Sequence, residues 1–78
     1  MKLPNKIIRY RESVISKFPS ILNNLSRGES SVLDLYMAVK SQMDDIADFA
    51  DALSSLYALG KINYNPTTRR LSYVATNM

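Results

Sequence analysis

The chain is a short basic protein of 78 residues, with ten Lys and Arg, seven Asp and Glu, and a formal net charge of +3. It contains no cysteine and no histidine, which excludes disulfides and thiolate metal sites and removes the commonest general base and metal ligand. A chain of this length buries only about 60% of its unfolded surface. One domain over residues 1–78 is expected, stabilised by association with a partner.

An extended N-terminal arm is predicted over residues 1–11. Pro4 favours an extended conformation at Leu3, and the residues that follow alternate between apolar and basic. Such an arm can pair with the exposed edge of a sheet in its own domain or in a partner.

A helix is predicted over residues 13–26, where apolar residues recur with helical spacing. Its apolar stripe consists of Val14, Ile15, Phe18, Ile21, Leu22 and Leu25. Pro19 lies on the opposite face and predicts a kink or a break near Lys17 and Phe18. Because the stripe continues past the proline, a kink is favoured over a break.

A second helix is predicted over residues 31–42, with Ser31 as its N-cap and an acidic residue three positions later. Its inward face is expected to contain Val32, Leu35, Tyr36, Val39 and Met43.

A third helix is predicted over residues 45–59, capped by Asp44 or Asp45 and ended by Gly60 in a left-handed conformation. Its inward face is expected to contain Ile46, Phe49, Ala50, Leu53, Leu56 and Tyr57. Strand patterns follow at 61–65 and 69–75 around a turn at Pro66. The fold class is therefore α+β, mainly α, in the order of a winged helix-turn-helix: arm, three helices and a C-terminal β-hairpin wing.

Charge is distributed unevenly along the chain. Residues 1–27 contain six basic residues against one glutamate, whereas residues 44–59 contain four aspartates and no Lys or Arg. A DNA-reading winged helix inserts its third helix into the major groove, where phosphates repel an acidic helix. The helix dipole accounts for acidic residues in the first turn, but Asp51 lies beyond that turn. The pattern favours a protein partner over DNA.

No sequence pattern in the chain indicates a catalytic or cofactor site. The four aspartates lack the glycine turn and the closing glutamate of a calcium loop. A non-enzymatic protein without metal or cofactor is expected. Since neither a signal segment nor a membrane-spanning segment is visible, a cytoplasmic location is also expected.

Three segments together resemble a known family. The opening Leu-Pro-Asn-Lys-Ile-Ile of residues 3–8, the Glu-Ser-Val-Ile of residues 12–15 and the Leu-Ser-Ser-Leu-Tyr-Ala-Leu-Gly-Lys-Ile of residues 53–62 are similar to the small middle components of bacterial ABC three-component systems. The resemblance implies a non-catalytic adaptor in an anti-phage or anti-plasmid defence complex of the Lamassu type. It implies two partners, an ABC ATPase of the SMC or Rad50 type and an effector subunit.

Two sets of surface residues follow from these hypotheses. The partner interface is predicted to contain Lys2, Leu3, Pro4, Lys6, Ile7, Asp45, Asp48 and Asp51. The alternative function is a small DNA-binding regulator, whose basic arm and wing would contact phosphate or the minor groove through Arg9, Arg11, Arg69 and Arg70. The adaptor hypothesis allows at most weak, non-specific DNA binding. A homodimer of the isolated chain stays open as a third possibility.

Overall fold

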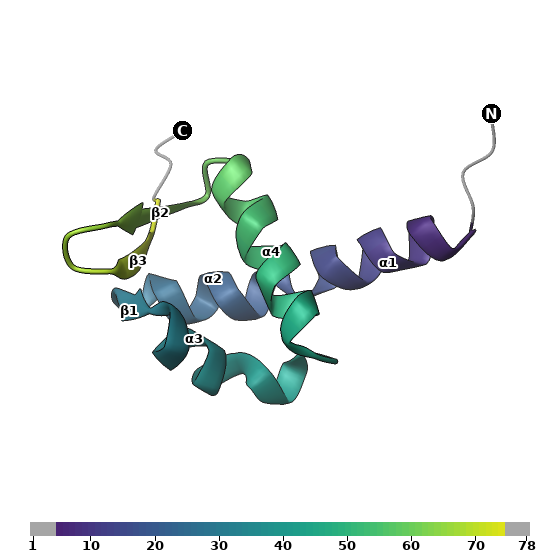
Figure 1. The fold of residues 1–78 in the computed structure, drawn as a ribbon, viewed down its shortest axis with the longest axis horizontal. Helices are drawn as coiled ribbons and strands as arrows, with labels where there is room; N and C mark the ends of the chain where they lie inside the picture. Colours follow the sequence, from purple (N-terminus) through teal and green to yellow (C-terminus); the bar gives the residue numbers. More distant parts are fainter. Residues whose placement is uncertain (1–4, 75–78) are drawn as a thin grey trace.

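The computed structural model describes residues 5–74, with side chains from Tyr10 onward. The elements in chain order are α1 (Asn5–Ser16), α2 (Phe18–Ser26), β1 (Ser30–Ser31), α3 (Val32–Val39), the 3-10 turn η1 (Lys40–Gln42), α4 (Ile46–Ala58), β2 (Ile62–Asn65) and β3 (Arg70–Tyr73). The order from α2 to β3 is that of a winged helix-turn-helix, with α3 and α4 as the helix pair and β2–β3 as the wing (Figure 1). The predicted fold class is confirmed.

Helix α1 replaces most of the predicted extended arm. The arm over residues 1–11 is wrong from Asn5 onward, where the chain is helical, while residues 1–4 lie outside the described part. Proline restricts the residue before it and is well tolerated at the start of a helix, so Pro4 gives no reason against a helix beginning at Asn5. In Figure 1, α1 projects away from the other helices and from the wing.

Helices α1 and α2 are separated by a turn at Lys17, so the kinked helix predicted over residues 13–26 is wrong and the break is correct. Pro19 stands in the first turn of α2, where a missing backbone N–H costs nothing because that group has no partner within the helix. The free-energy cost of a proline inside a helix is avoided because a new helix begins at Phe18. The two helices still follow one another in the same general direction (Figure 1).

Hydrogen bonds confirm the predicted start of α3 and the predicted end of α4, whereas α3 ends at Val39 and not at residue 42, because Lys40–Gln42 form the 3-10 turn. The Ser31 side chain accepts a hydrogen bond from the Asp34 N–H at 3.1 Å, as an N-cap does. Gly60 has a φ of 73° and donates to the Tyr57 carbonyl at 3.0 Å, while Lys61 donates to the Leu56 carbonyl at 2.9 Å. These two bonds form a Schellman motif, which ends α4 and directs the chain into β2.

The wing belongs to a three-stranded antiparallel sheet in the order β1-β3-β2. Strand β1 pairs Ser30 with Leu71 and Ser31 with Arg70. It was not predicted, because two serines carry no apolar alternation. This short strand attaches the hairpin to the helices, which matters because an isolated two-stranded hairpin is marginal in water. At the wing tip, the Asn65 side chain accepts from the Thr67 and Thr68 N–H groups at 2.9 and 3.3 Å.

The core lies between α2, α3, α4 and the sheet, and Val14 of α1 also contributes to it. Its buried apolar members are Val14, Ile21, Leu25, Leu35, Val39, Phe49, Ala52, Leu56, Ile62 and Leu71. Several residues predicted to face inward are exposed instead: Ile15, Val32, Ile46, Ala50 and Tyr57. The predicted apolar stripes are wider than the buried faces of the helices, and the exposed members of each stripe lie on the flanks of the helices.

Candidate functional site

The first turn of α4 holds its aspartates in a capping network. The Asp45 side chain accepts from the Asp48 N–H at 2.9 Å. The Asp48 side chain turns back and accepts from the Asp44 N–H at 3.3 Å. Asp48 is only 5% exposed. Its carboxylate binds a backbone N–H group and lies at the positive end of the helix dipole. Its predicted role at a partner interface is therefore corrected, because a buried cap offers no contact surface.

The remaining aspartates have different surroundings. Asp44 lies 3.9 Å from the Lys17 ammonium, and its side chain is 76% exposed, so this pair contributes little to stability. Asp45 is exposed but is the N-cap of α4. Asp51 is exposed and lies on the flank of α4 that faces α1. Of the predicted interface aspartates, Asp51 is the one whose carboxylate has no capping role.

Replacing Asp45 by alanine should lower the free energy of unfolding by about 1 kcal/mol, within a range of about 0.5–2 kcal/mol, because a helix N-cap is lost. The matched control is Asp51→Ala, which should stay within about 0.5 kcal/mol of wild type, since this side chain is exposed and does not cap. Urea unfolding followed by circular dichroism measures both. Equal losses in the two variants would contradict the capping assignment.

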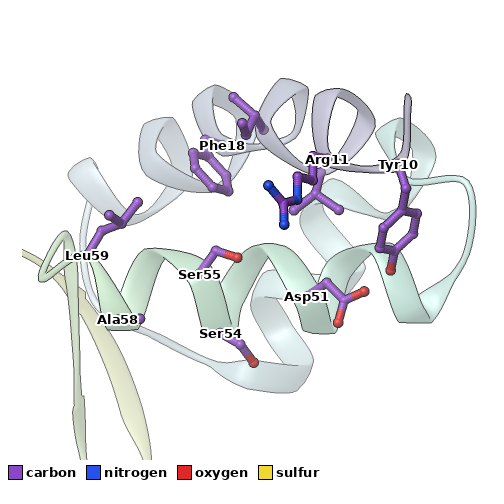
Figure 2. Close-up of a pocket in the computed structure, with 10 residues that line it drawn as sticks. Tyr10, Arg11, Phe18, Asp51, Ser54, Ser55, Ala58 and Leu59 are labelled. Atoms are coloured by element: carbon purple, nitrogen blue, oxygen red, sulfur yellow. The ribbon is translucent and has the colours of Figure 1, made fainter. Parts of the chain in front are cut away.

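A groove of about 610 Å³ lies between α1 and α4 (Figure 2). One wall comes from α1 and the start of α2, and the other comes from α4. Its lining residues are Tyr10, Arg11, Val14, Ile15, Phe18, Asp51, Ser54, Ser55, Ala58 and Leu59. Small residues of α4 leave the space open: Ser54, Ser55 and Ala58 face the larger side chains of α1 and α2. Arg11 and Asp51 give one end of this mostly apolar groove both signs of charge (Figure 2).

A second groove, of about 410 Å³, lies between α3 and α4, the two helices of the helix-turn-helix. Its lining residues are all apolar or aromatic: Val32, Leu33, Tyr36, Ile46, Phe49, Ala50 and Leu53. The rings of Tyr36 and Phe49 meet across the two helices with their centroids 5.0 Å apart. Around this contact, Val32, Leu33 and Ile46 remain largely exposed.

The two grooves lie on opposite flanks of α4. They share no lining residue. Leu53 of the α3–α4 groove and Ser55 of the α1–α4 groove are two positions apart, which corresponds to about 200° around a helix axis. Residues 5–74 hold no cluster of three or more acidic side chains placed to bind a metal ion. The chemistry offered by this part of the chain is contact with apolar side chains, on two separate surfaces.

The predicted basic residues do not form one surface. Arg11 lines the α1–α4 groove, whereas Arg69 and Arg70 stand at the wing, on the other side of the molecule from α1 (Figure 1). Lys6, Ile7 and Arg9 belong to α1, and Lys2, Leu3 and Pro4 lie outside the described residues. Arg69 adopts a φ of 58° to close the turn into β3, a conformation that costs a residue with a Cβ about 1–2 kcal/mol.

The family model for ABC-three component (ABC-3C) system Middle Component 7 matches residues 3–71. The match extends over most of the 78-residue chain, from the beginning of α1 to the wing. The chain belongs to this family of middle components. No curated protein and no solved structure matches this middle component.

Both grooves were missed at the level of sequence. Their walls include Ile15, Val32 and Ile46, which helical periodicity assigned to the core. An available signal was the surplus of apolar positions: α4 carries apolar residues on more of its circumference than one buried face requires. No helix in the described part of this middle component combines the length and the apolar character that a membrane crossing requires.

Proposed function

We propose that this middle component is a non-catalytic adaptor that bridges an ABC ATPase of the SMC or Rad50 type and an effector subunit. The complex would be a defence system of the Lamassu type, directed against phages or plasmids. The observation that carries the proposal is the pair of apolar grooves on opposite flanks of α4, because a bridge needs two separate contact surfaces. Membership of the middle-component family supports the existence of partner subunits.

The charge of α4 supports protein contact over DNA reading. No Lys or Arg occurs between residues 41 and 60, so the helix that enters the major groove in DNA-reading winged helices carries no group that attracts phosphate. The outer flanks of α4 expose Ile46 and Tyr57. Large exposed apolar side chains of this kind favour a protein interface.

A non-catalytic role is supported by the side chains that the sequence offers. Without histidine or cysteine, general acid–base or nucleophilic catalysis would need Asp, Glu, Lys, Ser or Tyr in a pocket. The polar side chains of the α1–α4 groove are Tyr10, Arg11, Asp51, Ser54 and Ser55. The serines there have no imidazole to activate them, and we assign these residues to binding.

Co-expression of the chain with the ABC ATPase and the third subunit encoded beside it tests this function. A tag on the ATPase should recover the effector when the middle component is present and much less of it when the middle component is omitted. The matched control is a tag on the effector, which should recover the ATPase with the same dependence. Recovery of a full ATPase–effector complex without this chain would contradict a bridging role.

A second function is favoured by one observation, the exposed Arg69 and Arg70 at the wing. A wing can contact DNA phosphates even when the recognition helix does not enter the groove. This would make the chain a small DNA-binding regulator, which the affinity and the sequence preference of DNA binding at physiological salt distinguish from the adaptor.

A further inference from the structure

We propose that the groove between α3 and α4 receives an amphipathic helix of a partner subunit, and that basic residues accompany the apolar stripe of that helix. The inference rests on the proposed function, since it names the kind of segment that one of the two surfaces binds. The groove lies in the helix-turn-helix, the part of the fold that reads DNA in other winged helices. The proposal therefore gives the helix-turn-helix of this chain a protein helix as its ligand.

The chemistry of the lining calls for an apolar occupant. All seven side chains that line the groove are apolar or aromatic, and no charged group points into it. Leu33 is 68% exposed and Ile46 is 65% exposed, so two large side chains on opposite walls remain in contact with water. A cluster of this kind on a winged-helix domain is typical of a binding groove rather than of scattered surface residues.

The shape of the groove fits a helix of about two turns. On α4 the lining positions are Ile46, Phe49, Ala50 and Leu53, with the spacing i, i+3, i+4 and i+7. Seven residues of helix correspond to about 10 Å. An amphipathic helix that inserts side chains at its own i, i+3 or i+4, and i+7 positions has a matching length. The tilted contact between Tyr36 and Phe49 forms the floor on which those side chains would rest.

Charge complementarity determines which amphipathic helix is favoured. The helix-turn-helix segment, residues 28–60, contains six acidic residues and one lysine. This negative field attracts a helix with Lys or Arg beside its apolar stripe and repels an acidic one. The Asp48 charge is held inside the first turn of α4, and Asp51 lies on the opposite flank of that helix. The exposed acidic residues beside the groove are Asp34, which follows Leu33, and Asp45, which precedes Ile46.

Leu33→Glu is the variant that tests the groove. Leu33 is in the first turn of α3, where a glutamate is compatible with the helix dipole, so the fold should persist. The matched control is Met37→Glu, which adds the same charge at an exposed apolar residue of α3 that lines neither groove. Circular dichroism and urea unfolding should show that both variants fold.

In the co-expressed three-subunit complex, a photo-crosslinking amino acid at Leu33 should crosslink one partner subunit. Mapping by mass spectrometry should place the crosslink in a helical segment with apolar residues at i, i+3 or i+4, and i+7 and with Lys or Arg beside them. Leu33→Glu should reduce recovery of that subunit at least about tenfold, as loss of a central anchor does, while Met37→Glu leaves its recovery unchanged.

Three results would overturn the assignment while leaving the adaptor function intact: a crosslink to an acidic or non-helical segment, a crosslink to α1 of a second copy of this chain, or equal sensitivity of the complex to the two variants. Failure of the wild-type chain to recover either subunit would overturn the adaptor function and this inference together. Loss of recovery that decreases with rising salt for Leu33→Glu, but not for Leu33→Lys, would contradict the predicted sign of charge on the partner, because salt screens repulsion between like charges.

Discussion

Leu56→Ala should lower the free energy of unfolding by about 2–5 kcal/mol, because a fully buried leucine loses its packing and leaves a cavity. Leu56 is 1% exposed and lies in the core cluster. In a chain of about 70–80 residues a single hydrophobic core rarely supplies more than about 3–5 kcal/mol, so the variant should be partly unfolded at physiological temperature. Urea unfolding at 25 °C, followed by far-ultraviolet circular dichroism, measures the loss.

Two neighbouring leucines make this prediction specific. Leu53→Ala should cost less than Leu56→Ala, because Leu53 is only partly buried and also forms a wall of the α3–α4 groove. Leu59→Ala should stay within about 0.5 kcal/mol of wild type, since Leu59 is 63% exposed at the end of α4. An equal loss in all three variants would show that the packing of α4 differs from the arrangement described above.

The second large effect concerns DNA. The isolated domain should bind duplex DNA weakly, without sequence preference and with a steep dependence on salt. If Arg69, Arg70 and one basic residue of the N-terminal segment contact phosphates, three contacts give a slope of about −2.7 in log affinity against log salt. Raising the salt fourfold, from about 50 to about 200 mM, should then weaken binding about 40-fold. Fluorescence anisotropy with two unrelated duplexes measures both the slope and the absence of preference.

A double variant separates wing contacts from the rest of the basic surface. Arg69→Gln with Arg70→Gln should make the slope shallower by about 1.8, since each phosphate contact contributes about 0.9. The matched control is Lys40→Gln, which removes a basic residue that follows α3 and should leave the slope unchanged. A nanomolar, sequence-selective complex at physiological salt would instead support the regulator and would contradict the adaptor as the primary function.

The elements whose hydrogen bonds are local could be predicted from sequence. Ser31 was recognised as a cap because its side chain needs only the N–H group three residues later. Gly60 was recognised as the end of α4 because the left-handed conformation it adopts is accessible to glycine at no steric cost. The acidic character of α4 and its lack of Lys or Arg are properties of the sequence itself, and they already directed attention from DNA to a protein partner.

The errors at the N-terminal end came from evaluating local signals separately. The alternation of apolar and basic residues after Pro4 predicted an extended segment, but the chain is helical from Asn5, and proline itself constrains only the residue before it. Pro19 was predicted to kink one helix over residues 13–26, although it also suits the first turn of a new helix. In both cases the sequence was compatible with two conformations. The packing of α1 against α4 favours the helical conformation of residues 5–16, because it brings Val14 into the core.

The sequence by itself determined the fold class, the N-cap of α3, the glycine that ends α4, and the acidic charge of α4. Only the tertiary structure decided which apolar residues stay on the surface. Periodicity identifies the apolar flanks of a helix, but a flank is buried only if another element covers it. Here α3 does not cover Ile46 of α4, and α4 does not cover Ile15 of α1. The Asp48 side chain turns inward and caps α4. The two grooves are therefore a property of how the helices are spaced.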